Sequence, residues 1–251
     1  VLYQHENEMA QALQRGLLPP ALRAVPGIEV AAAYRPAAEG VGGDFYDLWP
    51  LEERVWGFAV GDVCGTGADA AAFNGVARAT FRALSLTGAG PAEWLRGLNA
   101  TLLLGAADEP WRERFCTVVA GTLRLDGDGA VLRLATGGHP PPILRRLASP
   151  PVPVPVTGTL IGALDEVRIG ELDVRLDPGD QLVLYTDGVT DVRQPDGTIL
   201  GERGLLDLLG TSDQSPEALV RDLVAQLWAD RPPDDDVALL VLGPRPAPMA
   251  G

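Results

Sequence analysis

Segments that favour β-strands follow one another along this chain in runs, and two pairs of helix-like segments interrupt them. Apolar or alternating stretches predict strands at 28–34, 45–51, 55–60, 117–125, 131–135, 143–147, 172–176, 181–186 and 237–242. Helices are expected at 68–86, 91–104, 205–209 and 216–228. A parallel α/β fold alternates strand and helix, whereas this order predicts an α+β fold with antiparallel sheets covered by helices.

A single acid, Asp62, stands just beyond the most apolar early strand, at 56–60. The glycine turn Gly65-Thr66-Gly67 follows it and leads into an alanine-rich helix. An acid at a strand end beside glycines is well placed to meet a ligand. Further acids share this context, in Gly42-Gly43-Asp44, in Thr186-Asp187-Gly188 and in the run 234–236. We expect these separated acids to converge on one divalent-metal site.

The chemistry of such a site follows from its donors. The candidate ligands are Asp44, Asp62, Asp187 and either Asp235 or Asp236. Their mutual repulsion must be offset by a cation, and an all-oxygen donor set favours Mg²⁺ or Mn²⁺ over zinc or copper. Two ions that share one carboxylate can activate a water and clamp a phosphate for in-line attack. No covalent nucleophile is then required.

Each acid also has an ordinary structural interpretation. Asp44 can cap a turn, Asp187-Gly188 is a common turn pair, and 234–236 can be a solvated run of charges. Taken together, the repeated strand-end context favours a site over these local roles.

Three other motifs resemble functional ones. Gly65-Thr66-Gly67 lacks the lysine of a phosphate-binding P-loop. His139 is either a general acid or, as we favour, a loop residue that holds the backbone before consecutive prolines. The segment 126–129 (DGDG) lacks the downstream glutamate of a calcium loop, so it predicts a hairpin turn.

Composition excludes several classes of protein. The net charge is −14, which argues against a nucleic-acid surface. No apolar run reaches the ~18 residues of a membrane span. Cys64 and Cys116 fit no disulfide framework or zinc spacing, so we expect reduced thiols in a cytoplasmic protein.

An ordered set of motifs carries a resemblance to a known family. These are residues 13–19 (LQRGLLP), 42–47 (GGDFYD), 61–67 (GDVCGTG), 137–141 (GGHPP), 184–191 (LYTDGVTD) and 235–241 (DDVALLV). The chain resembles the metal-dependent serine/threonine protein phosphatases of the type 2C superfamily, in its bacterial RsbU/SpoIIE-like branch. The resemblance implies a four-layer αββα sandwich in which helices flank two central antiparallel sheets. It implies a linker or regulatory helix at 1–20, a phosphatase domain at 21–243 and a disordered tail at 244–251.

The resemblance also assigns roles to residues. It implies two Mn²⁺ or Mg²⁺ ions, with Asp62 and Asp187 as the catalytic carboxylates. The implied metal ligands are Asp44, Asp62, the backbone carbonyl of Val63, Asp187 and Asp235. Asp235 is preferred to Asp236, although this assignment can slip by one residue. Cys64 and Thr66 stand where other members of the superfamily carry histidine, and the phosphate-binding arginine of eukaryotic members has no clear counterpart.

The function implied by the resemblance is hydrolysis of phosphoserine or phosphothreonine in proteins. In this branch the substrate resembles a phosphorylated anti-anti-sigma protein of the STAS type. Because the chain begins at Val1, we expect a longer full-length protein. The resemblance implies that the helix expected at 1–18 joins an upstream sensor domain to the phosphatase and is a candidate dimerisation segment. The alternatives are a catalytically weak or inactive protein-binding module and a hydrolase of small phosphorylated metabolites.

Overall fold

The computed structural model describes residues 22–37, 42–106, 115–147, 149–194, 196–210, 215–228 and 232–246. Two five-stranded antiparallel sheets form its centre. The first sheet has the order β1 (Ile28–Arg35), β10 (Val237–Pro244), β9 (Gln181–Tyr185), β6 (Ile143–Arg145) and β7 (Val152–Pro153). The second has the order β2 (Phe45–Glu52), β3 (Val55–Val63), β4 (Cys116–Asp126), β5 (Gly129–Gly137) and β8 (Gly170–Leu176).

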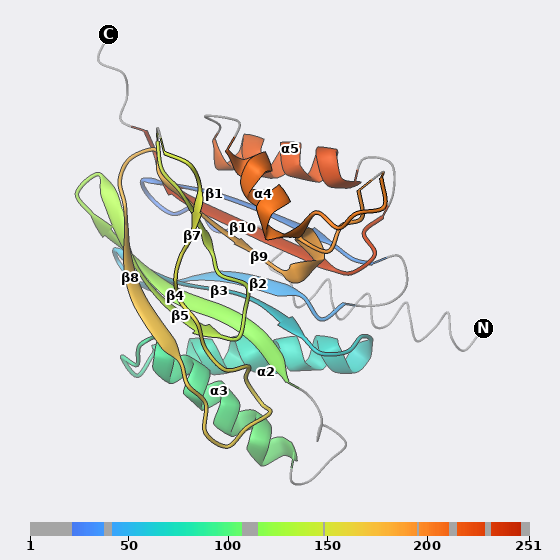
Figure 1. The fold of residues 1–251 in the computed structure, drawn as a ribbon. Coiled ribbons are helices and arrows are strands. Elements are labelled where there is room, and N and C mark those ends of the chain that lie inside the picture. The colour runs from blue at the N-terminus through green and yellow to red at the C-terminus, as the bar shows by residue number, and fades with distance from the viewer. Residues whose placement is uncertain are drawn as a thin grey trace.

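Helices cover the outer face of each sheet (Figure 1). Helices α4 (Gly201–Leu209) and α5 (Pro216–Trp228) pack on the first sheet, and α2 (Ala68–Ser85) and α3 (Pro91–Ala106) pack on the second. The expected four-layer αββα sandwich is therefore confirmed. The expected helix at 1–18 lies outside the described residues, as does the part of the expected tail at 244–251 that follows residue 246.

Alternation along each strand divides the apolar side chains among three cores. On β3, Phe58 and Val60 face the other sheet, whereas Ala59 faces α2 and α3. On β10, Leu240 faces the other sheet and Leu239 faces α4 and α5. Because both faces of these strands are covered, they carry continuous apolar runs rather than the alternating pattern of a half-exposed sheet.

Pairing between strands moves several predicted boundaries. Strand β3 continues past the expected end at residue 60, because Asp62 pairs with Thr117 and Val63 pairs with Cys116 on β4. Strand β10 reaches Pro244, and the N–H of Arg245 donates to the carbonyl of Gly27 over 3.0 Å. The segment 126–129 is the expected hairpin turn between β4 and β5.

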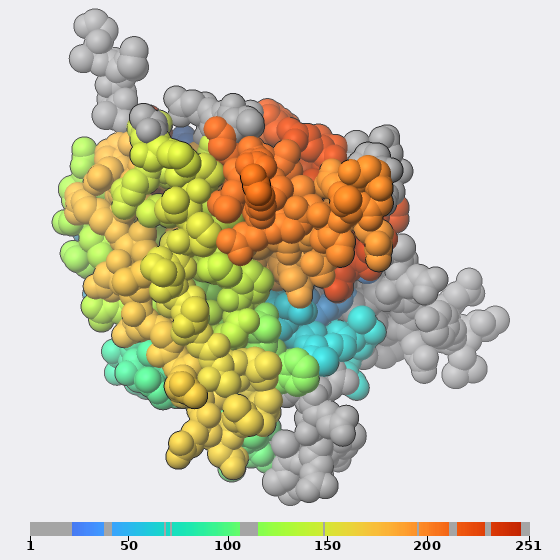
Figure 2. Space-filling model, in the orientation of Figure 1, coloured from blue at the N-terminus to red at the C-terminus, as the bar shows by residue number. Residues whose placement is uncertain are grey.

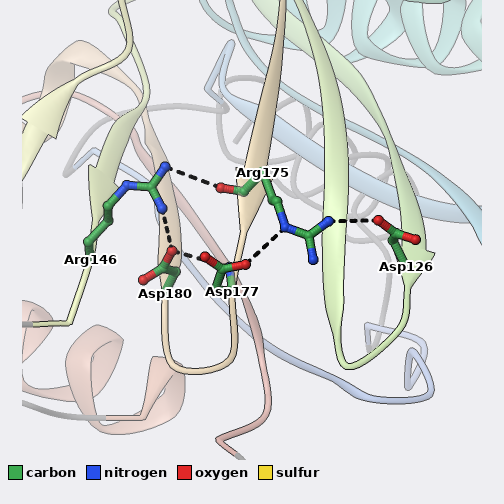
Figure 3. Close-up of polar contacts among 5 residues, drawn as sticks. All are labelled: Asp126, Arg146, Arg175, Asp177 and Asp180. Carbon is green, nitrogen blue, oxygen red and sulfur yellow. Dashed lines mark hydrogen bonds and ion pairs between the residues drawn. The ribbon is translucent and has the colours of Figure 1, made fainter.

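The chain passes from the first sheet to the second between β7 and β8, and this segment (yellow) runs down one side of the molecule in Figure 2. Polar contacts join the two sheets where β8 leads into β9, one from Arg146 to the Arg175 carbonyl and one from the Asp177 N–H to Asp180 (Figure 3). Arg146, after β6, contacts Asp180 over 2.7 Å and the carbonyl of Arg175 over 3.4 Å. Arg175, on β8, pairs with Asp126 over 2.7 Å and with Asp177 over 2.9 Å. These pairs lie by the β4–β5 turn, at the opposite end of β4 from Thr117.

Candidate metal centre

The acids expected from sequence come to one end of both sheets. Asp62 is the penultimate residue of β3, and Asp44 directly precedes β2, whose Phe45 pairs with Gly61. In the other sheet, Asp187 follows β9 and the run 234–236 precedes β10. Strands β9 and β10 are antiparallel neighbours in which Tyr185 pairs with Leu239, so these two ends coincide.

Two side-chain contacts join the sheets at this end. The hydroxyl of Thr186 donates to Asp44 Oδ2 over 2.5 Å. The Asp236 carboxylate accepts from the backbone N–H of Ala37 over 2.8 Å and of Gly43 over 3.1 Å. The loop that carries Asp44 is therefore fixed by residues next to Asp187 and Asp235.

Glycine is required where this loop approaches β3. A Cβ on Gly43 would lie 2.2 Å from the carbonyl oxygen of Val63 and 3.0 Å from Asp62 Oδ1. A Cβ on Gly42 would lie 1.6 Å from Asp236 Oδ2. The Gly-Gly pair thus lets the backbone before Asp44 come close to the Val63 carbonyl and to two carboxylates.

Asp235 and Asp236 differ in what their carboxylates do. Asp236 is only 5% exposed, and each of its oxygens accepts a backbone N–H. Asp235 is exposed, and its Oδ1 accepts from the N–H of Asp236 over 2.8 Å. Asp235 is also close enough to Asp62 and Asp187 to raise the pKa of both. This geometry favours Asp235 as the ligand and gives Asp236 a structural task.

Burial and mutual repulsion disturb the ionisation of the cluster. Burial, followed by the charges of Asp187 and Asp235, raises the pKa of Asp62 to about 6. Burial and the charge of Asp62 raise the pKa of Asp44 well above its usual range, and burial and Asp235 raise that of Asp187. A hydrogen bond between the Asp44 and Asp62 carboxyls opposes the rise in the pKa of Asp62. A cation would relieve this repulsion, so the cluster fits a divalent ion electrostatically.

The donor set also fits a hard cation. In the described part of the chain, no three His, Cys, Asp or Glu side chains are placed to hold one ion by themselves. Magnesium commonly binds through one or two carboxylates and keeps several waters, so it does not need such a cage. The Val63 carbonyl beside Gly43 can add a further oxygen.

The other residues singled out from sequence have different surroundings. His139 is buried, its Nδ1 lies 2.9 Å from the hydroxyl of Thr117, and burial lowers its pKa to about 4. It is therefore neutral at pH 7, which favours the loop role over that of a general acid. Cys64 and Thr66 are exposed in the turn, where Gly65 and Gly67 have φ of 103° and 86°.

Sequence reasoning missed two residues that contact Asp44. One is Thr186, and the other is the buried Asn74 of α2, whose Nδ2 lies 3.4 Å from the carbonyl of Asp44. It also missed two ion pairs behind the site, which Asp47 forms with Arg78 over 3.1 Å and with Arg82 over 2.9 Å. The four-residue spacing of these arginines on a predicted helix was the available signal.

Comparison with known proteins shows the family to which this chain belongs. Residues 52–245 match the family model described as stage II sporulation protein E (SpoIIE). The chain belongs to the SpoIIE family. The family resemblance drawn from the ordered motifs is thereby confirmed.

Two curated relatives and one solved structure are similar to this chain. Protein IcfG of Synechocystis sp. (strain ATCC 27184 / PCC 6803 / Kazusa) is 26% identical over 88% of this chain and 38% of its own length. Phosphoserine phosphatase RsbP of Bacillus subtilis (strain 168) is 23% identical over 94% of this chain and 57% of its own length. A solved structure of the RsbU and RsbW domains of Rv1364c from Mycobacterium tuberculosis has a TM-score of 0.74 and 25% identity. That match covers 92% of this chain and 64% of the other.

The chain thus spans between about two fifths and three fifths of the curated relatives named here. None of the helices among the described residues is both long enough and apolar enough to span a membrane.

Proposed function

We propose that this domain is a metal-dependent protein phosphatase that hydrolyses phosphoserine or phosphothreonine. The observation that carries the proposal is the gathering of Asp44, Asp62, Asp187 and Asp235 at one end of the sandwich. Burial and the charges of the neighbouring acids raise the pKa values of Asp44, Asp62 and Asp187 there. Membership of the SpoIIE family supports it, as does the description of RsbP as a phosphoserine phosphatase.

We assign two Mn²⁺ or Mg²⁺ ions to the cluster. Asp62 hydrogen-bonds to Asp44, and its pKa is raised by the charges of Asp187 and Asp235, so it would help both groups of acids to hold the ions. Asp44 and the Val63 carbonyl stand on one side, and Asp187 and Asp235 on the other. When bound, the ions would supply Lewis acidity that activates a water for in-line attack on phosphorus. The protein's own part is to hold these oxygens in place: Asp236 fixes the loop before Asp44, and Gly43 admits it beside β3.

The exposure of the cluster bears on the substrate class. Asp187 and Asp235 are exposed side chains, so the proposed centre is open toward solvent on the side of the first sheet. Small metabolites are generally bound in enclosed pockets, whereas a phosphorylated side chain on a protein can reach an open edge. We therefore favour a phosphoprotein over a metabolite, and we propose a phosphorylated anti-anti-sigma protein of the STAS type. The similarity of this chain to the phosphoserine phosphatases RsbP and RsbU supports this choice.

The proposed setting is a longer cytoplasmic protein, in which an upstream sensor domain acts through residues 1–20 and the chain can form a homodimer. The rival proposal is a catalytically weak or inactive protein-binding module. All of the candidate acids are present in this chain, which favours the enzyme.

The test compares hydrolysis of p-nitrophenyl phosphate, a phosphoserine protein and phosphorylated metabolites, each with Mn²⁺ and with EDTA. We expect Mn²⁺-dependent turnover that favours the phosphoprotein, and we expect Asp62→Asn to abolish it in a folded protein. Turnover in folded Asp62→Asn near that of the wild type would contradict the metal-centre assignment. Binding of the phosphoprotein without turnover by the wild type would favour the rival module.

A further inference from the structure

The hydroxyl of Thr186 lies where the two sheets meet, and it is completely buried. Strand pairing between β9 and β10 ends at Tyr185 and Leu239. One residue further on, the Thr186 N–H donates to the Ala238 carbonyl over 3.1 Å, and the Ala238 N–H donates to Thr186 Oγ1 over 2.9 Å. The Thr186 hydroxyl thus accepts a hydrogen bond that a backbone carbonyl would accept in a regular sheet. This contact fixes the rotamer of the Thr186 side chain.

The position of the hydroxyl proton follows from these contacts. A threonine hydroxyl has one proton to donate. Its possible acceptors here are Asp44 Oδ2 at 2.5 Å and the Ala238 carbonyl at 3.5 Å. The short contact to an ionised carboxylate is the stronger hydrogen bond, so the proton points to Asp44 whenever that carboxylate is charged.

We propose that Thr186 is a positioning residue, which orients the Asp44 carboxylate so that its second oxygen is left for a metal ion. This inference rests on the proposed function, because it concerns the same site. Residues that hydrogen-bond to metal ligands set the orientation of those ligands, and their loss commonly weakens metal binding by about 10- to 100-fold. Asp44 directly precedes β2 of the second sheet and Thr186 directly follows β9 of the first, so the bond also fixes the two halves of the site relative to each other.

The central variant is Thr186→Val, which keeps the shape and removes the hydroxyl. Thr186→Ser keeps both hydrogen bonds and is the rescue variant. Thr136→Val is the matched control, because Thr136 is equally buried and its hydroxyl donates to the Val118 carbonyl at 3.4 Å rather than to an acid. Thr186→Cys, which fills the space with a poor donor, replaces Thr186→Val if the latter does not fold.

The measurement is calorimetric titration of Mn²⁺ into the EDTA-treated chain of residues 1–251, alongside the melting temperature in EDTA. We expect Thr186→Val to weaken Mn²⁺ binding by about 10-fold or more. Thr186→Ser and Thr136→Val should stay within about threefold of the wild type. In an Asp44→Asn background, Thr186→Val should cause little further loss of affinity, because the hydroxyl then has no ligand to orient.

Three results would overturn the inference. Wild-type Mn²⁺ affinity in folded Thr186→Val would show that Asp44 needs no such support. An equal loss of affinity with and without Asp44→Asn would show that Thr186 acts only through the stability of the sheet. Failure of the wild type itself to bind Mn²⁺ would overturn the proposed metal dependence, and this inference with it.

Discussion

Asp236 accepts a hydrogen bond from the N–H of Gly43, which lies 193 residues earlier in the chain, over 3.1 Å. With its second bond to the Ala37 N–H, the Asp236 carboxylate holds the loop before Asp44 against the start of β10. The neighbouring Asp235 is exposed and faces the charges of Asp62 and Asp187. Two adjacent aspartates thus have opposite tasks, one structural and one directed at the proposed metal centre.

This division of tasks predicts opposite phenotypes for two matched variants. Asp235→Asn should lose most Mn²⁺ binding and turnover, about 100-fold or more, and melt in EDTA near the wild-type temperature. Asp236→Asn should lower the free energy of unfolding by roughly 1–3 kcal/mol, because the amide NH2 would replace one of the two oxygens and face a backbone N–H donor. Calorimetry with Mn²⁺ and thermal melting in EDTA measure both effects. The assignment has slipped by one residue if Asp236→Asn loses the metal while Asp235→Asn keeps it.

The pKa of Asp62 predicts how the stability of the metal-free protein depends on pH. Folding raises this pKa from 3.8 to about 6, so the folded state binds the proton more tightly than the unfolded chain does. The contribution of Asp62 to the free energy of unfolding therefore falls as pH rises through this window, and the deficit persists at pH 7. Protonation below pH 4 removes the deficit.

Asp62→Asn removes this ionisation and serves as the comparison. In EDTA, the stability of the variant relative to the wild type should be greater at about pH 7.5 than at about pH 4.5, by roughly 1–3 kcal/mol. Urea unfolding of both proteins at both pH values checks this, since titrations common to the two proteins cancel. Saturating Mn²⁺ at neutral pH should reverse the order of stability, because the ions bind only the folded wild type. A difference in the free energy of unfolding that does not change with pH would mean that folding does not raise the pKa of Asp62.

The ion pair beneath the centre predicts a large effect on stability. Asp47 is completely buried on β2, and Arg78 of α2 is only 15% exposed. Asp47→Asn removes the charge that pairs with Arg78 and Arg82, so we expect the free energy of unfolding to fall by about 3–5 kcal/mol. The matched control is Asp173→Asn, since Asp173 and Arg133 form a pair in which both side chains are 54% exposed. That variant should cost at most about 1 kcal/mol in urea unfolding, and an equal cost for both would contradict the importance of burial.

Contacts from α2 to the centre predict a route for regulation. Asn74 donates a hydrogen bond to the Asp44 carbonyl, and Arg78 and Arg82 donate to the Asp47 carboxylate. A tilt of α2 would therefore move the start of β2, next to Asp44. We expect partners that bind residues 1–18 or the helices α2 and α3 to shift the centre between weak and strong metal binding, which requires different affinities for the two states.

The test of this route compares three forms of the protein. Mn²⁺ affinity and turnover are measured in the full-length protein, in the chain of residues 1–251 and in the chain that lacks residues 1–18. We expect low basal turnover and a millimolar Mn²⁺ requirement in the isolated chain. Identical values in all three forms would leave residues 1–18 as a passive linker.

The sequence by itself determined the elements and three of the acids. Strand runs, helix pairs and glycine turns are local patterns, and a strand followed by Gly-rich residues fixes where its last side chains emerge. Asp44, Asp62 and Asp187 could therefore be placed at strand ends from their local sequence alone, and the antiparallel order implied that those ends could meet. The length of β3 beyond residue 60, in contrast, depends on the neighbouring strand, because its last residues pair with Thr117 and Cys116 on β4.

Only the tertiary structure decided which acid does what. Asp235 and Asp236 share the same local sequence, and they differ because the Ala37 and Gly43 N–H groups point at one of them. The bond from Thr186 to Asp44 spans 142 residues and exists only where one sheet stacks on the other. Such contacts depend on how the two sheets are placed relative to each other, which is set by the packing of their shared apolar core. The sequence pattern of either segment alone does not indicate them.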